Sequence, residues 1–215
     1  MPIFRRFLHK GDATAIWQTS ESVDELHALF LKSPTADAPA YATLASDKRR
    51  KEWLAERLLL RCAFLRCDDI GHRADGSPYL TAGGAHVSIS HSGPFVALSL
   101  SAAARIGIDL EQRGPRALRL REKFLSPGEY GYDEPEDAET AALTAWSAKE
   151  AAFKLFGRPG ISLKNGIRLT HAADDAPLPL LEASLSDGTA CAMVCCRLFP
   201  EFVFTRATFL PAGTL

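Results

Sequence analysis

The sequence predicts an α+β fold of two similar subdomains, a pseudo-dimer in which each half packs one long helix on a small, mainly antiparallel sheet. Two observations predict it. Apolar residues recur at helical spacing over 47–66 and again over 141–156, and several short strand-like runs follow each segment. The boundary falls near residues 105–114. We expect an N-terminal subdomain at 1–105, a C-terminal subdomain at 106–215, and the active site in the cleft between them.

The composition is that of an ordinary soluble globular protein. The 215 residues are 47% hydrophobic and 24% charged, enough apolar material for a sizeable core. The net charge of −1 gives no sign of nucleic-acid binding. The first apolar run is too short and too interrupted for a secretory signal, and no apolar stretch is long enough to span a bilayer. We therefore expect a cytoplasmic monomer that binds neither nucleic acid nor a membrane.

The five cysteines indicate neither disulfides nor a metal cluster. Their odd number and the expected cytoplasmic location argue against a disulfide framework. Cys191, Cys195 and Cys196 lie in an apolar run that is typical of a strand. Alternation would send Cys195 and Cys196 to opposite faces, so we interpret all three as buried, inert thiols.

The N-terminal half begins with a stretch that is hard to interpret. Residues 16–17 indicate a short strand and residues 22–32 a helix, but the rest of 1–45 gives no clear pattern. Residues 47–66 are rich in Leu, Ala, Arg and Glu, and predict a long helix. A turn is expected at residues 75–78.

Strands are predicted in the middle of the chain. Residues 87–100 read as two strands around a turn, and the serines of the first strand share one face. Residues 105–111 alternate between apolar and polar side chains, so Asp109 and Glu111 should lie on the face opposite the apolar set. Gly107 on the same face as the carboxylates leaves room for something to approach closely.

The C-terminal half repeats the plan of helix and strands. Residues 116–124 predict a short helix, and residues 126–129 resemble a capping box at the start of another. Residues 141–156 predict a second long helix that Gly157 ends. Strand-like runs follow at 166–169, 178–184, 190–198 and 202–209.

Asp109 and Glu111 form the first candidate site. Mg²⁺ prefers oxygen ligands, and two carboxylates on one face of a strand can share an ion. The plain alternative is a strand end whose acidic residues face solvent. A second candidate is Glu150 with Lys154, four residues apart on one helix face. The alternative there is a solvated ion pair, although Trp146, one turn earlier, indicates a face that is not fully exposed.

Two further segments could bind phosphate. Ser90 and His91 lie at a predicted strand end, where hydroxyl and imidazole groups suit an anion, although a polar strand end serves equally well without a ligand. The helix at 47–66 carries more basic than acidic residues, and guanidinium groups donate two hydrogen bonds to phosphate at once. For most of these residues a solvated basic face is the simpler interpretation.

Together these motifs resemble the 4′-phosphopantetheinyl transferase superfamily, in its single-chain, two-half type. The family pattern is Gly-x-Asp-x-Glu, followed by Trp-(Ser/Cys/Thr)-x-Lys-Glu-Ala-x-x-Lys. Both are complete here, at residues 107–111 and 146–154. Residues 89–92 and 124–129 are similar to two further stretches of the family, and the resemblance covers residues 47–169.

The resemblance implies a reaction and a metal. The enzyme would transfer the 4′-phosphopantetheine arm of coenzyme A to a serine of an apo acyl or peptidyl carrier protein, releasing 3′,5′-ADP. Mg²⁺ would be held by Asp109, Glu111 and Glu150. Glu150 could also deprotonate the serine, and Lys154 would contact the transferred phosphate, so the implied catalytic residues are Asp109, Glu150 and Lys154.

The resemblance also implies residues that contact coenzyme A. Ser90 and His91 would hold its 3′-phosphate, Arg50 and Arg57 its nucleotide, and Lys149 would assist Lys154. One position departs from the pattern. Many relatives have Gly-Lys-Pro in the turn before the serine-histidine strand, and this chain has Ser77 in place of the lysine.

Two alternative functions remain open at this point. The chain could be a non-catalytic relative that binds coenzyme A or a carrier protein. The absence of a metal-ligating residue from the motifs would indicate this, and none of those residues is missing. It could also be an unrelated Mg²⁺ phosphohydrolase, which would act on simple phosphate esters without a carrier protein.

Overall fold

The structure, a computed structural model, describes residues 3–9, 11–32, 39–67, 69–132, 137–172 and 179–210. The chain separates into two units, Met1–Ala104 and Arg105–Leu215, here called the N-terminal unit and the C-terminal unit. Within the described ranges, no helix has both the length and the apolar character needed to cross a membrane.

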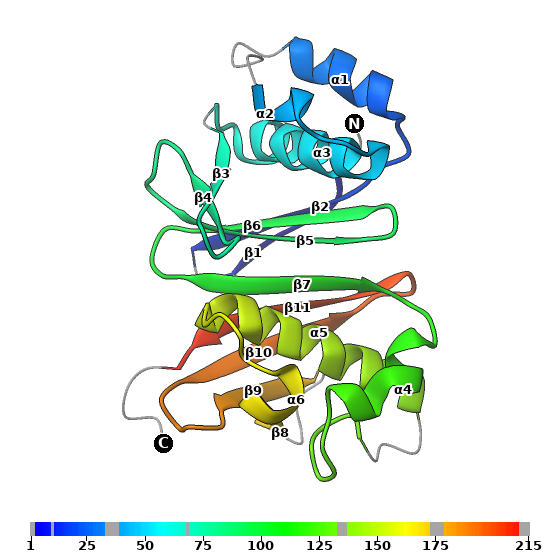
Figure 1. The fold of residues 1–215 in the computed structure, drawn as a ribbon, viewed down its shortest axis with the longest axis vertical. Helices are drawn as coiled ribbons and strands as arrows, with labels where there is room; N and C mark the ends of the chain where they lie inside the picture. The colour runs from blue at the N-terminus through cyan, green and yellow to red at the C-terminus, as the bar shows by residue number, and fades with distance from the viewer. Residues whose placement is uncertain are drawn as a thin grey trace. The chain divides into compact units, whose positions relative to one another are not determined.

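The N-terminal unit packs helices on a four-stranded antiparallel sheet of order β1-β2-β6-β5 (Figure 1). Its elements are β1 (Ile3–His9), β2 (Asp12–Gln18), α1 (Val23–Leu31), α2 (Pro39–Ala42), α3 (Asp47–Phe64), β3 (Ile70–His72), β4 (Pro78–Leu80), β5 (His86–Ser92) and β6 (Phe95–Ser101). Strands β3 and β4 form a separate pair. Apolar side chains of α1 and α3 meet those of β2, β5 and β6 in one core.

Helix α3 begins where the sequence predicts and ends before residue 66, where the sequence predicts its end. The Ser46 hydroxyl caps it by accepting a hydrogen bond from the Arg49 amide. The helix ends at Phe64 because Leu65 has a positive φ of 54°, in the left-handed region. The prediction that it continues to residue 66 is therefore wrong, and Leu65 is 86% exposed rather than part of the apolar face.

The C-terminal unit packs helix α5 on a five-stranded antiparallel sheet of order β7-β11-β10-β9-β8 (Figure 1). Its elements are β7 (Ile106–Gln112), α4 (Arg116–Leu120), the 3₁₀ turn η1 (Arg121–Lys123), α5 (Ala138–Phe156), α6 (Leu163–Gly166), β8 (Ile167–His171), β9 (Leu180–Leu185), β10 (Cys191–Leu198) and β11 (Phe202–Phe209). The predicted α+β class is confirmed, and its sheets are antiparallel.

Helix α5 starts earlier than predicted and stops where predicted. Asp137 caps it by accepting from the Thr140 amide, which adds a first turn before residue 141. Gly157 ends it with φ +60°, and the Gly157 amide donates to the Phe153 carbonyl. The guanidinium of Arg105 donates to the Lys154 carbonyl at 3.0 Å. This gives a hydrogen-bond donor to one of the carbonyls in the last turn, which have no partner within the helix.

Two local predictions need correction. Residues 126–129 do not begin a helix; the segment forms turns, although the Glu129 carboxylate does accept from the Ser126 amide at 2.6 Å.

Of the three cysteines interpreted as buried, only Cys196 is buried, because Cys191 and Cys195 point to the half-buried face of β10. None of the five cysteines, all of which lie in the described segments, forms a disulfide. Within the described segments no group of His, Cys, Asp or Glu side chains is set to hold a metal ion.

Candidate active site

The site in the C-terminal unit depends on the close approach of β7 and α5. Gly107 lies where the two elements touch: a Cβ there would fall against the carbonyl oxygen of Ala151 and 2.7 Å from the Leu155 amide nitrogen. Only a glycine allows this approach without moving the helix. Because side chains alternate along a strand, Asp109 and Glu111 share the face of Gly107 and therefore point towards α5.

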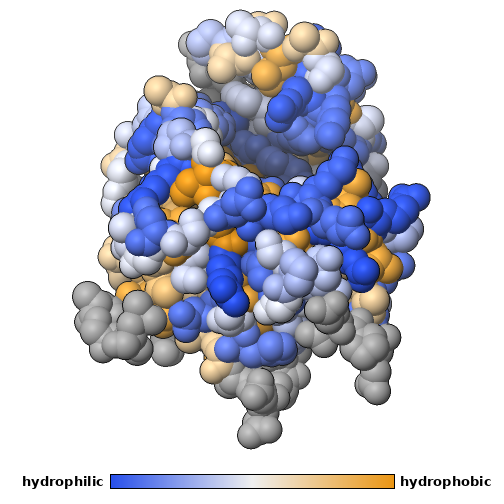
Figure 2. Space-filling view, turned by 60° about the horizontal axis from the view of Figure 1, so that its bottom comes forward, coloured by the Kyte–Doolittle hydropathy of each residue, from blue (hydrophilic) through white to orange (hydrophobic). Residues whose placement is uncertain are grey.

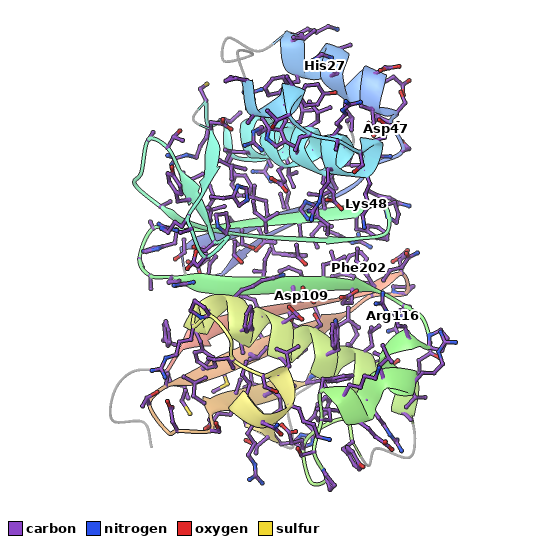
Figure 3. The ribbon with its side chains drawn as sticks, in the orientation of Figure 1. His27, Asp47, Lys48, Asp109, Arg116 and Phe202 are labelled. Carbon is purple, nitrogen blue, oxygen red and sulfur yellow. The ribbon has the colours of Figure 1, made fainter. Side chains whose placement is uncertain are left out.

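Asp109 is buried against α5 and is paired with Lys154. The carboxylate is 4% exposed, and its Oδ1 accepts a hydrogen bond from Lys154 Nζ at 2.8 Å. Lys154 Nζ also donates to the Ile108 carbonyl at 3.0 Å. The Lys154 side chain is 29% exposed. Figure 3 shows Asp109 between the strand and the helix. The ammonium group is thus fixed beside a buried carboxylate and still reaches solvent.

Glu111 is held by a neutral donor. Trp146 Nε1 donates to Glu111 Oε1 at 2.9 Å, and the indole packs edge-on against Phe124, with ring centroids 5.0 Å apart. Phe124 is fully buried, which fixes the indole from the other side. An indole N–H orients a carboxylate without neutralising it.

Glu150 lies among these charges. Its pKa is raised, first by burial and then by the negative charge of Asp109, with a smaller contribution from Glu111. The ammonium of Lys154 opposes the shift by lowering the pKa. Three carboxylates therefore lie close enough to act on one another, which is unfavourable without more positive charge.

These residues suit a divalent cation by charge and by ligand type. Their side chains, as they stand, do not form a ready-made group of three ligands. However, the like-charge effect on Glu150 is the observation expected where a cation would compensate. Carboxylate oxygens are also the ligands that Mg²⁺ prefers. On this test Asp109, Glu111 and Glu150 fit the ion that the motifs indicated.

Lys149 does not join this group. It is fully buried, and its Nζ contacts Glu129 Oε1 at 2.8 Å and the carbonyls of Leu163 and Ile167 at 2.9 and 2.6 Å. Burial lowers its pKa, and Glu129 opposes that shift. The expectation that Lys149 contacts coenzyme A does not agree with this position, because its amine is already used inside the unit.

The residues expected to bind the nucleotide lie in the N-terminal unit. Ser90 is 5% exposed on β5. His91 points to the other face, where its Nε2 lies 2.9 Å from Glu56 Oε1, and its side chain is 24% exposed. The histidine is therefore oriented by a carboxylate on α3, a partner that no motif indicated.

Arg50 and Arg57 are on the same helix but have different surroundings. Arg50 is partly exposed, and pairs with Asp47 at 3.3 Å and with the Leu44 carbonyl at 3.0 Å. Arg57 is 3% exposed; it lies 2.7 Å from Asp69, 3.5 Å from Glu56 and over the Trp53 ring. Its guanidinium is enclosed by protein partners, so the expected nucleotide contact does not agree with its position.

Three functional or supporting residues were missed or undervalued by sequence reasoning. The sequence presents Trp146 as an aromatic on the helix face and as the start of the second motif, and nothing in the spacing predicts its hydrogen bond to Glu111. Glu129 was considered as a cap, although it also pairs with Lys149. Glu56 was one acid among many bases on a helix. Long-range contacts of this kind leave no periodic signal.

Comparison with known proteins agrees with the motifs. Residues 105–192 match the model of the 4′-phosphopantetheinyl transferase superfamily. The 4′-phosphopantetheinyl transferase AcpT of Salmonella typhimurium is 35% identical over 115 residues, which cover 51% of this chain and 60% of that protein.

Two Bacillus proteins are similar as well. The 4′-phosphopantetheinyl transferase of Bacillus subtilis is 34% identical over 92 residues, 41% of this chain and 40% of that protein. The 4′-phosphopantetheinyl transferase psf-1 of Bacillus pumilus is 39% identical over 132 residues, 60% of this chain and 54% of that protein. The chain thus spans about half the length of the curated relatives it matches. Residues 105–192, which contain both motifs, are thus similar to the 4′-phosphopantetheinyl transferase superfamily.

Proposed function

We propose that this protein transfers the 4′-phosphopantetheine arm of coenzyme A to a serine of an apo carrier protein, with Mg²⁺, releasing 3′,5′-ADP. One observation carries the proposal. Three carboxylates that affect one another and one ammonium lie together on β7 and α5, inside the segment that matches the family. This arrangement suits cleavage of a phosphoanhydride, since the transition state gathers negative charge on phosphate oxygens.

Asp109, Glu111 and Glu150 would hold the metal. When bound, Mg²⁺ supplies positive charge to the pyrophosphate oxygens of coenzyme A. The three carboxylates differ in how the protein holds them: Asp109 by an ammonium, Glu111 by an indole, and Glu150 among like charges. Residues held in place before the substrate arrives lose less entropy when it binds.

Lys154 and Glu150 would act on the reacting groups. The Lys154 ammonium, fixed at Asp109 and partly exposed, would donate a hydrogen bond to an oxygen of the transferred phosphate. Glu150 would accept the proton of the incoming serine, directly or through a water. Its raised pKa favours this role, because a more basic carboxylate takes a proton more readily.

Ser90, His91 and Arg50 remain our proposal for contacts with the 3′-phosphate and nucleotide of coenzyme A. Arg50 keeps an exposed side chain, and the Glu56 carboxylate orients His91. Arg57 and Lys149 would support these contacts only indirectly. Each has its charged group paired inside its own unit, and would stabilise the helix that carries its neighbours.

Intact-mass measurement of apo carrier proteins tests the reaction. After incubation with coenzyme A and Mg²⁺, the carrier should gain the mass of one phosphopantetheine. The Asp109→Ala and Glu150→Gln variants should abolish the gain and keep the fold, as judged by circular dichroism. Glu139→Gln, an exposed change on the same helix, is the matched control. A panel of carriers that shows no gain with the wild-type protein would contradict the proposal.

We also propose that α4 and the following turn meet the carrier protein. Arg116 and Arg119 are exposed there, and Arg116 is labelled in Figure 3. Carrier helices are often acidic, and such contacts act mainly on the rate of association. Arg119→Glu should raise the KM for the carrier and leave the KM for coenzyme A unchanged, whereas the exposed control Lys32→Glu should change neither. Unchanged carrier kinetics in Arg119→Glu would reject this surface.

A further inference from the structure

The C-terminal unit contains a cavity of about 560 Å³ at the β8 side of its sheet, separate from the carboxylates on β7. Its size falls within the range of small-molecule sites, which is roughly 300–1,000 Å³. Strands β8, β9 and β10 contribute Arg168, Glu182, Ser184 and Cys191, and the short helix α6 contributes Lys164. Figure 2 shows that much of the exposed surface on one side of the molecule is hydrophilic.

Strand register brings polar side chains together in this cavity. Arg168 pairs with Ser184 across β8 and β9, and Ser184 pairs with Cys191 across β9 and β10, so the three side chains form one row. Their neighbours Leu169 and Ala183 point to the opposite face and lie in the core under α5. Arg168, Ser184 and Cys191 therefore lie on the face of the sheet away from α5. Because side chains alternate along each strand, the register puts all three on that same face.

The charges that line the cavity are unequal. Lys164 Nζ donates to the Glu122 carbonyl, a neutral group. In the part of the chain that the structure describes, neither Lys164 nor Arg168 has a carboxylate within ion-pair distance. The lining acids are otherwise engaged: Glu129 pairs with Lys149, and Glu182 accepts a hydrogen bond from the Cys191 thiol at 3.2 Å. Among the described residues, the cavity is thus lined by two cations and by one carboxylate, Glu182, that has no ion pair.

We propose that this cavity binds the oxyanion of a small metabolite, a phosphate or carboxylate group, between Arg168 and Lys164. A guanidinium presents paired N–H groups that match two oxygens of such an anion, and an ammonium adds a second charge. The hydroxyls of Ser184 and Ser186 can donate to the remaining oxygens. Burial and the neighbouring Glu182 raise the pKa of Cys191, so it is a thiol, which makes the cavity a poor metal site.

Cys191 itself can report occupancy. It lines the cavity and is half-buried, so a bound anion should slow its alkylation by iodoacetamide, read for this peptide by mass spectrometry. The probes are sodium phosphate and sodium malonate, each compared with sodium chloride at equal ionic strength. Protection by phosphate alone, by malonate alone or by both supports the site and tells which oxyanion it takes.

Substitutions distinguish this site from general salt effects. Arg168→Gln should raise the anion concentration for half-protection by about tenfold, the usual cost of one charged hydrogen bond. Lys123→Gln makes the same charge change at an exposed position outside the cavity and should leave protection unchanged. No protection by either anion, or equal protection in wild type and Arg168→Gln, would overturn the proposal. Arg168→Gln should keep its melting temperature and its transfer activity. Because the measurement follows alkylation of Cys191 and not transfer, its result does not depend on the proposed reaction.

Discussion

The N-terminal and C-terminal units each point charged side chains from a long helix towards a sheet, but they balance those charges differently. Arg57 of α3 lies between Glu56 and Asp69, so its guanidinium has two carboxylates of opposite charge beside it, and Glu56 also lies 2.9 Å from the His91 imidazole. On α5, burial and two neighbouring carboxylates raise the pKa of Glu150, and only part of that shift is opposed by Lys154. Matched charges of the first kind hold a fold together. An excess of one charge costs stability, and it is typical of a place where a ligand completes the balance.

The buried pair of Lys149 and Glu129 should show the largest effect on stability. Lys149→Met would leave the Glu129 carboxylate buried without its cation, which should lower the free energy of unfolding by about 3–5 kcal/mol. Urea unfolding followed by circular dichroism measures it. Adding Glu129→Gln to this variant should restore part of the loss. A stable Lys149→Met protein that has lost coenzyme A binding would show that Lys149 contacts the substrate instead.

Arg57→Met tests the matched network of the N-terminal unit. It should lower the free energy of unfolding by about 2–3 kcal/mol, since it removes the partner of Glu56 and the contact with the Trp53 ring. The cost is smaller than at Lys149 because the Asp69 side chain is 47% exposed and can be hydrated instead. The same unfolding measurement applies, with Arg49→Met as an exposed control on α3. Equal stability of the two variants would contradict the structural role of Arg57.

Trp146→Phe tests how the neutral donor positions Glu111. The phenyl ring keeps the contact with Phe124 but lacks the N–H, so Glu111 loses its orientation and not its charge. Groups that orient metal ligands typically change metal affinity by about 10–100-fold, and we expect about tenfold weaker Mg²⁺ binding by calorimetry. The melting temperature should change little. Mg²⁺ affinity equal to that of wild type would show that the indole does not position the carboxylate.

Glu150→Gln should change the free energy of unfolding less than Lys149→Met and Arg57→Met do, and the effect should be a gain. Burial, followed by Asp109, raises the folded-state pKa of Glu150 above its unfolded value. The ionised form is therefore disfavoured in the folded protein. The cost in folding free energy is absent at a pH below the pKa of Glu150 in the unfolded protein. It appears as the pH rises through the higher pKa of Glu150 in the folded protein.

At neutral pH without metal, Glu150→Gln should thus be more stable than wild type by more than the ~0.5 kcal/mol of ordinary surface changes. The gain should shrink as the pH falls. Thermal unfolding at several pH values measures it, with Glu139→Gln as the exposed control. A gain that does not depend on pH would mean that the charge of Glu150 is not the cause.

Local patterns account for most of the fold. Alternation over 105–111 and helical spacing over 146–154 place Asp109 and Glu150 on the faces that meet in the structure. Cap residues also predict the end of α5, because Gly157 adopts the left-handed conformation that its neighbours avoid.

Contacts between distant segments account for what the sequence did not predict. Lys149 and Lys154 have the same chemistry, and only the fold assigns one to Glu129 and the other to Asp109. Asp69 contacts Arg57 from a segment whose sequence has no helical or strand periodicity. Strand β1 likewise lies in a stretch with no clear periodicity. Side-chain partners across such separations depend on tertiary packing, which periodicity does not record.

Calorimetric titration of Mg²⁺ into the protein, with and without coenzyme A, tests the central claim most directly. Asp109 and Glu111 both raise the pKa of Glu150, so the three carboxylates should bind the ion weakly alone and more tightly when phosphate oxygens complete its ligands. We predict tighter binding with coenzyme A, and loss of that binding in Asp109→Ala. Equal affinity with and without coenzyme A, or unchanged affinity in Asp109→Ala, would contradict the account.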